Sequence, residues 1–269
     1  MTSPIHTDVF SLYPGTTPLL ISMPHVGTVI PPDLQPRYVE RALQVEDTDW
    51  HLEALYHFAR DMGASVLVPR YSRYVIDLNR PSENTPMYPG VNNTELCPTH
   101  FFTGDALYRE GMAPDKAEIS RRIATYWKPY RDALEAELTH LRTRHGHAVL
   151  FDAHSIKSEL PWLFECKLPD LNLGTAQGSS AAPALRDALA QVLSAQSTFT
   201  QVVDGRFKGG HITRHYGRPA EGWHAIQLEM CWSTYMEEAA PYVLSEDRAA
   251  GVKPVLQQLL QTLLQFQPQ

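Results

Sequence analysis

Short apolar runs alternate with longer amphipathic stretches along the chain. Uninterrupted apolar runs are typical of strands buried on both faces, and they predict strands at 19–22, 65–68, 74–78, 147–152 and 224–229. Apolar residues at helical spacing predict helices at 47–62, 119–141, 182–193 and 249–266. Pro129 is expected to kink the second of these helices. Strands alternating with helices indicate an α/β fold, a three-layer sandwich whose central mixed sheet lies between helices.

No repeat, low-complexity tract or linker interrupts residues 1–269, which favours a single domain. Residues 81–116 are the exception to the regular pattern, because they are rich in Pro, Asn, Gly and Thr and show little periodicity. A loop of that length inside a compact domain is typically a lid or a binding loop. We therefore expect residues 81–116 to border the functional site.

The formal net charge of -7 argues against a nucleic-acid partner. It permits a small anionic substrate, because local arginines can oppose the overall sign. Cys97, Cys166 and Cys231 are widely separated, as expected for reduced thiols. The start MTSPIHTDVF lacks the regions of a signal peptide, and no apolar run approaches the roughly 18 residues of a membrane span. We expect a cytoplasmic protein without a membrane partner, and the sequence leaves its oligomeric state open.

Several predicted strands run into a side chain that can bind a metal, move a proton or hold an anion. These are His25, Asn79 with Arg80, His154 and Glu229. The carboxyl ends of parallel strands meet at one edge of a sheet, so these groups can converge there. The structural alternatives are core histidines satisfied by a neighbouring carbonyl and a glutamate paired with an arginine.

The two histidines have the surroundings expected of metal ligands. Gly27 gives a tight exit after His25. Asp152 and His154 are two residues apart on a strand, so their side chains share a face, and a carboxylate beside a ligating imidazole is the usual supporting arrangement. Glu229 follows an apolar strand, where a raised pKa would suit a general base.

A third ligand is expected from the acidic segment that precedes the first predicted helix. Glu46, Asp47 and Asp49 all lie there, although acidic residues also favour helix amino termini for capping alone. Two histidines and one carboxylate match catalytic zinc, which keeps its fourth position for water. Asp47 is our prediction, and Glu46 and Asp49 remain alternatives.

Basic residues provide candidate anion-binding groups. Arginine offers a planar fork that matches a carboxylate, and the glycine-interleaved segment DGRFKGGHITRHYG concentrates such groups, although a solvated basic loop has the same composition. The candidate substrate-binding residues are Arg73, Asn79, Arg80, Arg206, His211 and Arg214, with Lys208 in the same segment.

The motifs SMPHVGT, EDTDWH, SRYVIDLNRP, LFDAHSI, LPDLNLGT, GRFKGGHITRHYG and HAIQLEMCWSTYMEE resemble, in this order, those of N-formylglutamate amidohydrolases, enzymes of histidine degradation. The resemblance covers about residues 15–240. It implies hydrolysis of N-formyl-L-glutamate to glutamate and formate, with Zn²⁺ or another divalent metal as cofactor. The alternatives are a deacylase or carboxypeptidase-like hydrolase of another N-acyl amino acid and a non-catalytic anion-binding protein.

The chain is also distantly similar to zinc carboxypeptidases and aspartoacylases, which implies a carboxypeptidase/phosphorylase-hydrolase-like fold. This similarity implies that His25 and His154 bind zinc and that Glu229 is the catalytic base. It also implies that Asn79 and Arg80 bind one substrate carboxylate, and Arg214 or another basic residue of 206–214 would bind the second. Thr28 stands where the HxxE pair of those enzymes has glutamate, so Asp47 is expected to replace that ligand.

Overall fold

A mixed β-sheet forms the centre of the protein. The computed structural model describes residues 3–85 and 93–268. In this part of the chain the sheet has eight strands in the order β1-β2-β4-β3-β5-β8-β6-β7. In chain order the strands are β1 (Ile5–His6), β2 (Phe10–Tyr13), β3 (Leu19–Ser22), β4 (Ser65–Pro69), β5 (Ala148–Ile156), β6 (Leu171–Gly174), β7 (Gln201–Val203) and β8 (Trp223–Cys231).

The four central strands β4, β3, β5 and β8 are mutually parallel. Antiparallel pairing with β2 on one side and with β6 on the other makes the sheet mixed. Parallel central strands place their carboxyl ends at the same edge. Catalytic or ligand-binding side chains that follow these strands can therefore meet at this edge.

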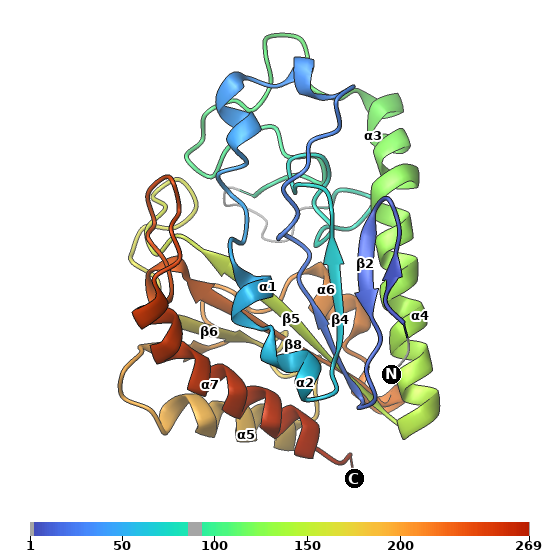
Figure 1. Ribbon diagram of the computed structural model, residues 1–269, viewed down its shortest axis with the longest axis vertical. Coiled ribbons are helices and arrows are strands. Elements are labelled where there is room, and N and C mark those ends of the chain that lie inside the picture. The colour runs from blue at the N-terminus through green and yellow to red at the C-terminus, as the bar shows by residue number, and fades with distance from the viewer. Residues whose placement is uncertain (1–2, 86–92, 269) are drawn as a thin grey trace.

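Helices cover both faces of the sheet, giving three layers (Figure 1). One face carries α1 (Leu52–Leu55), α2 (Phe58–Asp61), α5 (Pro183–Ser194) and α7 (Glu246–Gln265). The other carries α4 (Lys128–His145) and α6 (His211–Tyr216), and α3 (Lys116–Arg122) precedes α4. In the described part of the chain, no helix combines the length and hydropathy needed to cross a membrane.

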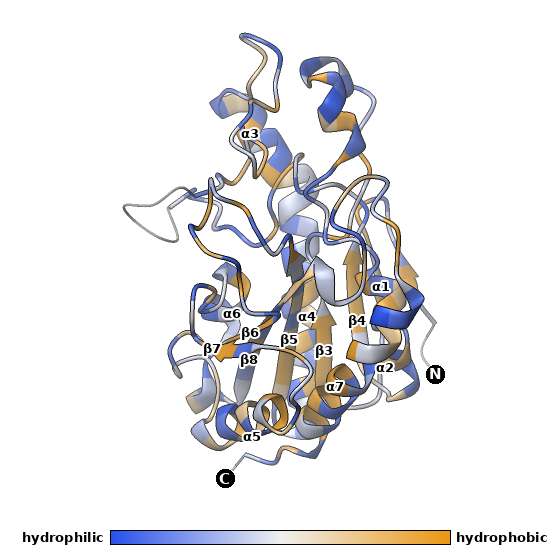
Figure 2. Cartoon of the chain, turned by 90° about the vertical axis from the view of Figure 1, so that its left-hand side faces the viewer, coloured by the Kyte–Doolittle hydropathy of each residue, from blue (hydrophilic) through white to orange (hydrophobic). Residues whose placement is uncertain are grey.

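Alternate residues of each central strand enter the two cores on opposite faces of the sheet. Leu19 and Ile21 pack with α1, α2, α5 and α7, whereas Leu20 packs on the α4 side. The side chains on both faces of the strand are fully buried, which explains why successive positions are apolar. Figure 2 shows the apolar strands between the helix layers.

The predicted strands at 19–22, 65–68, 147–152 and 224–229 are confirmed. The prediction for 74–78 is wrong, because these residues form turns. Their apolar side chains are buried in the α4-side core, so the run is apolar because it is buried, although it pairs with no described strand. The sequence did not predict β1, β2, β6 and β7, which are short.

The first predicted helix begins at residue 52 instead of 47 and is divided into α1 and α2. The second is interrupted by a π turn at Ile123–Trp127, directly before α4. Pro129 lies in the first turn of α4, where its missing N–H accounts for the break in the regular hydrogen-bond ladder.

Candidate active site

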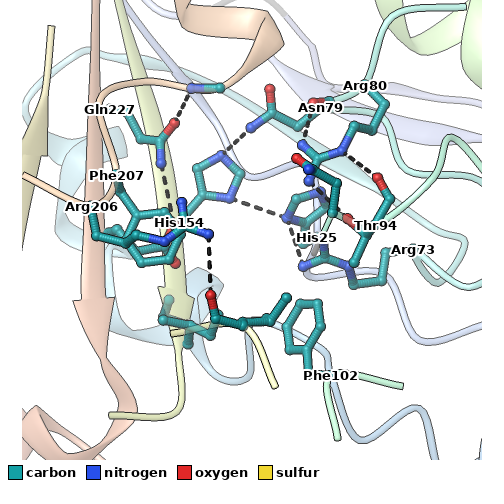
Figure 3. A pocket seen from close by; sticks show the side chains of 16 residues that line it. His25, Arg73, Asn79, Arg80, Thr94, Phe102, His154, Arg206, Phe207 and Gln227 are labelled. Carbon is teal, nitrogen blue, oxygen red and sulfur yellow. Dashed lines mark hydrogen bonds between the residues drawn. The ribbon is translucent and has the colours of Figure 1, made fainter. Parts of the chain in front are cut away.

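A pocket opens at the carboxyl ends of the parallel strands. Its floor contains groups from three of these strands or from the segments that follow them, and its walls come from loops (Figure 3). The described residues that line it are His25, Arg73, Asn79, Arg80, Asn93, Thr94, Phe102, His154, Ser155, Ile156, Leu163, Arg206, Phe207, Gly210, Gln227 and Glu229.

Three buried side chains direct potential metal-ligand atoms at one point. His25 Nδ1 lies 3.1 Å from His154 Nδ1, and Asp49 Oδ2 lies 3.2 Å from His154 Nδ1 and 3.7 Å from His25 Nδ1. Ligands bound tetrahedrally at about 2.0–2.2 Å are separated by about 3.3–3.6 Å. The spacing of these three atoms therefore suits one divalent cation.

Carboxylates on the far side of each ring set the orientation of the two imidazoles. His25 Nε2 is 2.7 Å from Asp77 Oδ1, and His154 Nε2 is 3.1 Å from Asp152 Oδ2. When each Nε2 carries the ring proton, each Nδ1 keeps its lone pair toward the centre, as in metal-ligating histidines. Two such lone pairs and one carboxylate oxygen repel one another unless a positive charge lies between them.

Asp49 is fixed as an anion at this centre. Its backbone N–H donates to His25 O at 3.1 Å, and its Oδ2 accepts from Ser155 N at 3.1 Å. Burial raises the pKa of Asp49, but hydrogen bonds and charges from His154 and His25, when these rings are protonated, hold that pKa below the usual value; with neutral rings, a bound cation would have the same effect. Asp49 thus has the charge and the position of the third ligand.

The structure does not bring Asp47, the predicted third ligand, to this cluster. Its Oδ2 accepts from Tyr74 OH at 2.8 Å and from Phe102 N at 3.0 Å. Glu46 is bound to Arg41, with Arg41 Nε 2.9 Å from Glu46 Oε2. Because residues 46–51 form turns and no helix, Asp49 can reach the end of β3. The geometry therefore favours the alternative Asp49.

Glu229 lies beside this centre, as predicted. It pairs with His154 across the β5–β8 ladder, so the two side chains share one face of the sheet. Burial is the main cause that raises the pKa of Glu229, and the charge of Asp49 adds to it, whereas His154 and Arg73 lower it. Gln227 Nε2 donates to Glu229 Oε2 at 3.2 Å. This environment suits a carboxyl group that accepts and releases a proton.

Three of the predicted cationic residues, Arg73, Arg80 and Arg206, line the pocket. Arg73 Nη2 pairs with Asp77 at 2.8 Å, and within the described residues its buried Nε has no hydrogen-bond partner. Arg80 donates to Thr94 O at 3.0 Å. Arg206 donates to the Leu163 carbonyl at 3.3 Å. Figure 3 shows Arg80 and Arg206 on opposite sides of the two histidines.

The other predicted anion-binding residues lie differently. Asn79 borders the pocket, but its Oδ1 accepts from Ile212 N at 2.8 Å and its Nδ2 lies 3.0 Å from His154 Nε2. Arg214 is exposed and donates to Gly209 O at 2.9 Å. Neither Arg214 nor His211 borders the pocket, and burial lowers the pKa of His211 to about 3, so its imidazole is neutral.

Sequence reasoning missed Asp77, Gln227 and Phe102. Period-two spacing before Glu229 was an available signal for Gln227, because both lie on β8. Asp77 lies in an irregular segment, where no regular period indicates its direction. Phe102 belongs to the loop predicted at 81–116, of which Asn93 and Thr94 also line the pocket. Residues 86–92 of that loop lie outside the described residues, so its predicted role as a lid stays a prediction.

Comparisons with known proteins identify the family to which the chain is similar. The family model for N-formylglutamate amidohydrolase matches residues 17–236. The chain is 50% identical over 256 residues to N-formylglutamate deformylase of Pseudomonas putida, covering 95% of this chain and 96% of the relative. It is 49% identical over 257 residues to N-formylglutamate deformylase of Pseudomonas aeruginosa PAO1, covering 96% of both.

Two solved structures share the fold. The N-formylglutamate amidohydrolase from Ralstonia eutropha JMP134 has a TM-score of 0.80 at 25% identity, covering 96% of each chain. A gene product of Agrobacterium tumefaciens has a TM-score of 0.70 at 17% identity, covering 96% of this chain and 95% of that one. From the family match and the near-complete coverage, the chain belongs to the N-formylglutamate amidohydrolase family.

Proposed function

We propose that the protein hydrolyses N-formyl-L-glutamate to L-glutamate and formate with a divalent metal, Zn²⁺ being the best match, as the last step of a histidine degradation route. One observation carries the proposal: His25, Asp49 and His154 direct ligand atoms at one point beside the buried Glu229. The activity of the Pseudomonas relatives, as their names give it, supports this choice of substrate.

The donor set suits Zn²⁺, which accepts two imidazole nitrogens and one carboxylate oxygen and keeps a further position open in catalytic sites. A divalent metal, when bound, supplies Lewis acidity that polarises the formyl carbonyl and acidifies a water molecule. Asp77 and Asp152 fix the two imidazoles for this task. Neutral rings with protonated Nε2 atoms present the Nδ1 lone pairs that such a site needs.

Glu229 acts as the base and then as the acid. Its carboxylate takes a proton from the attacking water as the new C–O bond forms at the formyl carbon. The same proton then passes to the amide nitrogen, so that the C–N bond breaks and glutamate leaves as an amine. A raised pKa lets Glu229 hold the proton between the two steps.

Arginines at the pocket wall bind the two carboxylates of the substrate. Arg80 and Arg206 flank the metal-ligand cluster on opposite sides, so a dicarboxylate held between them has its formamide group over His25 and His154. Arg73 Nε is a buried donor that a substrate oxygen can satisfy. Positioning at both ends converts much of the binding energy into a reactive geometry.

The test is formate release from N-formyl-L-glutamate, followed with formate dehydrogenase on metal-quantified protein. We expect turnover that disappears after chelation and returns when Zn²⁺ is added. N-acetyl-L-glutamate and N-formyl-L-aspartate are the comparison substrates: faster hydrolysis of either would favour a different deacylase. Protein that holds N-formyl-L-glutamate without releasing formate would instead be an anion-binding protein.

A further inference from the structure

A small apolar cluster beside the pocket is separate from the two cores of the sheet. Its members are Phe102, Ile156, Leu160, Leu168 and Cys231, with Leu163, Phe164 and Phe207 packed against them. Four of these residues, Phe102, Ile156, Leu163 and Phe207, also line the pocket. The cluster therefore forms an apolar wall at the reaction centre.

Phe102 is the member of this wall that lies against Arg73. It follows Phe101 in a tight turn in which Gly104 N donates to Phe101 O at 2.9 Å. The Arg73 guanidinium carbon lies 4.6 Å from the centre of the Phe102 ring, and Arg73 Nη1 lies 3.2 Å from His25 Nδ1. Figure 3 shows the ring directly beneath Arg73. The Arg73 guanidinium group thus contacts both the Phe102 ring and His25, and all three line the same pocket.

The turn that carries Phe102 is held at both ends. Asp47 is 2% exposed, and its Oδ2 accepts both the Phe102 N–H and the Tyr74 hydroxyl. At the other end, Gly104 has φ +91°, and a Cβ added to it would lie 2.6 Å from Trp162 Cδ1. The close packing of Trp162 and the buried carboxylate together leave the turn little freedom to move away from the pocket.

We propose that Phe102 limits the acyl group to formyl, and that Asp47 is the positioning residue that keeps Phe102 in place. This inference rests on the proposed function. A formyl carbon carries only hydrogen, whereas an acetyl carbon carries a methyl group that needs additional volume beside the reacting carbonyl. A pocket that merely fits poorly discriminates weakly against one methyl group, so strong selection needs a wall that cannot yield. By accepting the Phe102 N–H, Asp47 keeps the ring from moving aside for a methyl group.

The test compares kcat/KM for N-formyl- and N-acetyl-L-glutamate in Phe102→Ala, Asp47→Ala and Asp47→Asn. We expect the formyl-to-acetyl ratio to fall at least tenfold in Phe102→Ala and in Asp47→Ala. Asp47→Asn retains an oxygen that can accept both hydrogen bonds, so it should keep the wild-type ratio within about threefold. Phe164→Ala is the matched control, because it removes the same side chain from the same cluster without lining the pocket.

Metal content provides the second measurement. Every variant should bind as much Zn²⁺ as the wild type, because the proposed role of Asp47 is to position Phe102 and not to bind the metal. An unchanged ratio in Phe102→Ala, or loss of metal from Asp47→Ala, would overturn the inference while wild-type turnover of N-formyl-L-glutamate upholds the proposed function. No wild-type turnover of N-formyl-L-glutamate would overturn both.

Discussion

Replacing Glu229 by Gln removes the proposed proton acceptor with little change in shape. Gln227 Nε2 lies 3.2 Å from Glu229 Oε2, so the oxygen of the new amide can keep this hydrogen bond while its NH₂ group faces the reaction. An NH₂ group cannot accept a proton from water. The three metal-ligand residues remain, and we expect unchanged Zn²⁺ content.

General base catalysis contributes roughly 10²–10⁴-fold to a rate, which corresponds to about 2.7–5.4 kcal/mol in activation free energy. We therefore expect kcat of Glu229→Gln to fall by at least about 100-fold. The assay is formate release at saturating N-formyl-L-glutamate, with Glu53→Gln, an exposed glutamate on α1, as the matched control. A fully metallated Glu229→Gln variant with kcat within tenfold of wild type would refute the assignment of the base.

Three further predictions concern other parts of the structure. Asp49→Asn should weaken Zn²⁺ binding by more than about 100-fold, the upper range for losing a mere supporting residue; metal titration checks this, and wild-type affinity would reassign the ligand. Arg206→Ala should raise KM about 10- to 100-fold, since hydrogen bonds to charged groups contribute about 1.5–3 kcal/mol; steady-state kinetics with an unchanged KM would exclude Arg206 as a carboxylate-binding group. Leu228→Ala, at a fully buried position of β8, should lower the free energy of unfolding by about 2–5 kcal/mol in urea titrations, and a loss below about 1 kcal/mol would mean that the surrounding core collapses around the cavity.

The sequence predicted the central parallel strands because these strands are buried on both faces. Leu19 to Ser22 is apolar at nearly every position for that reason. Residues 74–78 have a similar composition but form turns, since an apolar run reports burial and not hydrogen-bond pairing. The short strands β2, β6 and β7 pair with strands distant in sequence, which local patterning does not contain. Among the described strands, β1 pairs only with the adjacent β2 and is two residues long.

The candidate site was predictable where its residues belong to strands. His154 and Glu229 face the same side because their strands pair in register, and alternation along a strand fixes such a face. The choice between Asp47 and Asp49 depended on a turn with left-handed residues at Val45 and His51, so no regular period assigned their directions. Arg214 illustrates the same difficulty: its basic segment pointed to anion binding, but the side chain is exposed.

The most direct test of the central claim is anomalous X-ray scattering at the zinc edge from crystals of the Zn²⁺-loaded protein. We predict one strong peak about 2.0–2.2 Å from His25 Nδ1, His154 Nδ1 and an Asp49 carboxylate oxygen. A zinc peak coordinated by Asp47 in place of Asp49, or no peak between the two histidines, would contradict the account.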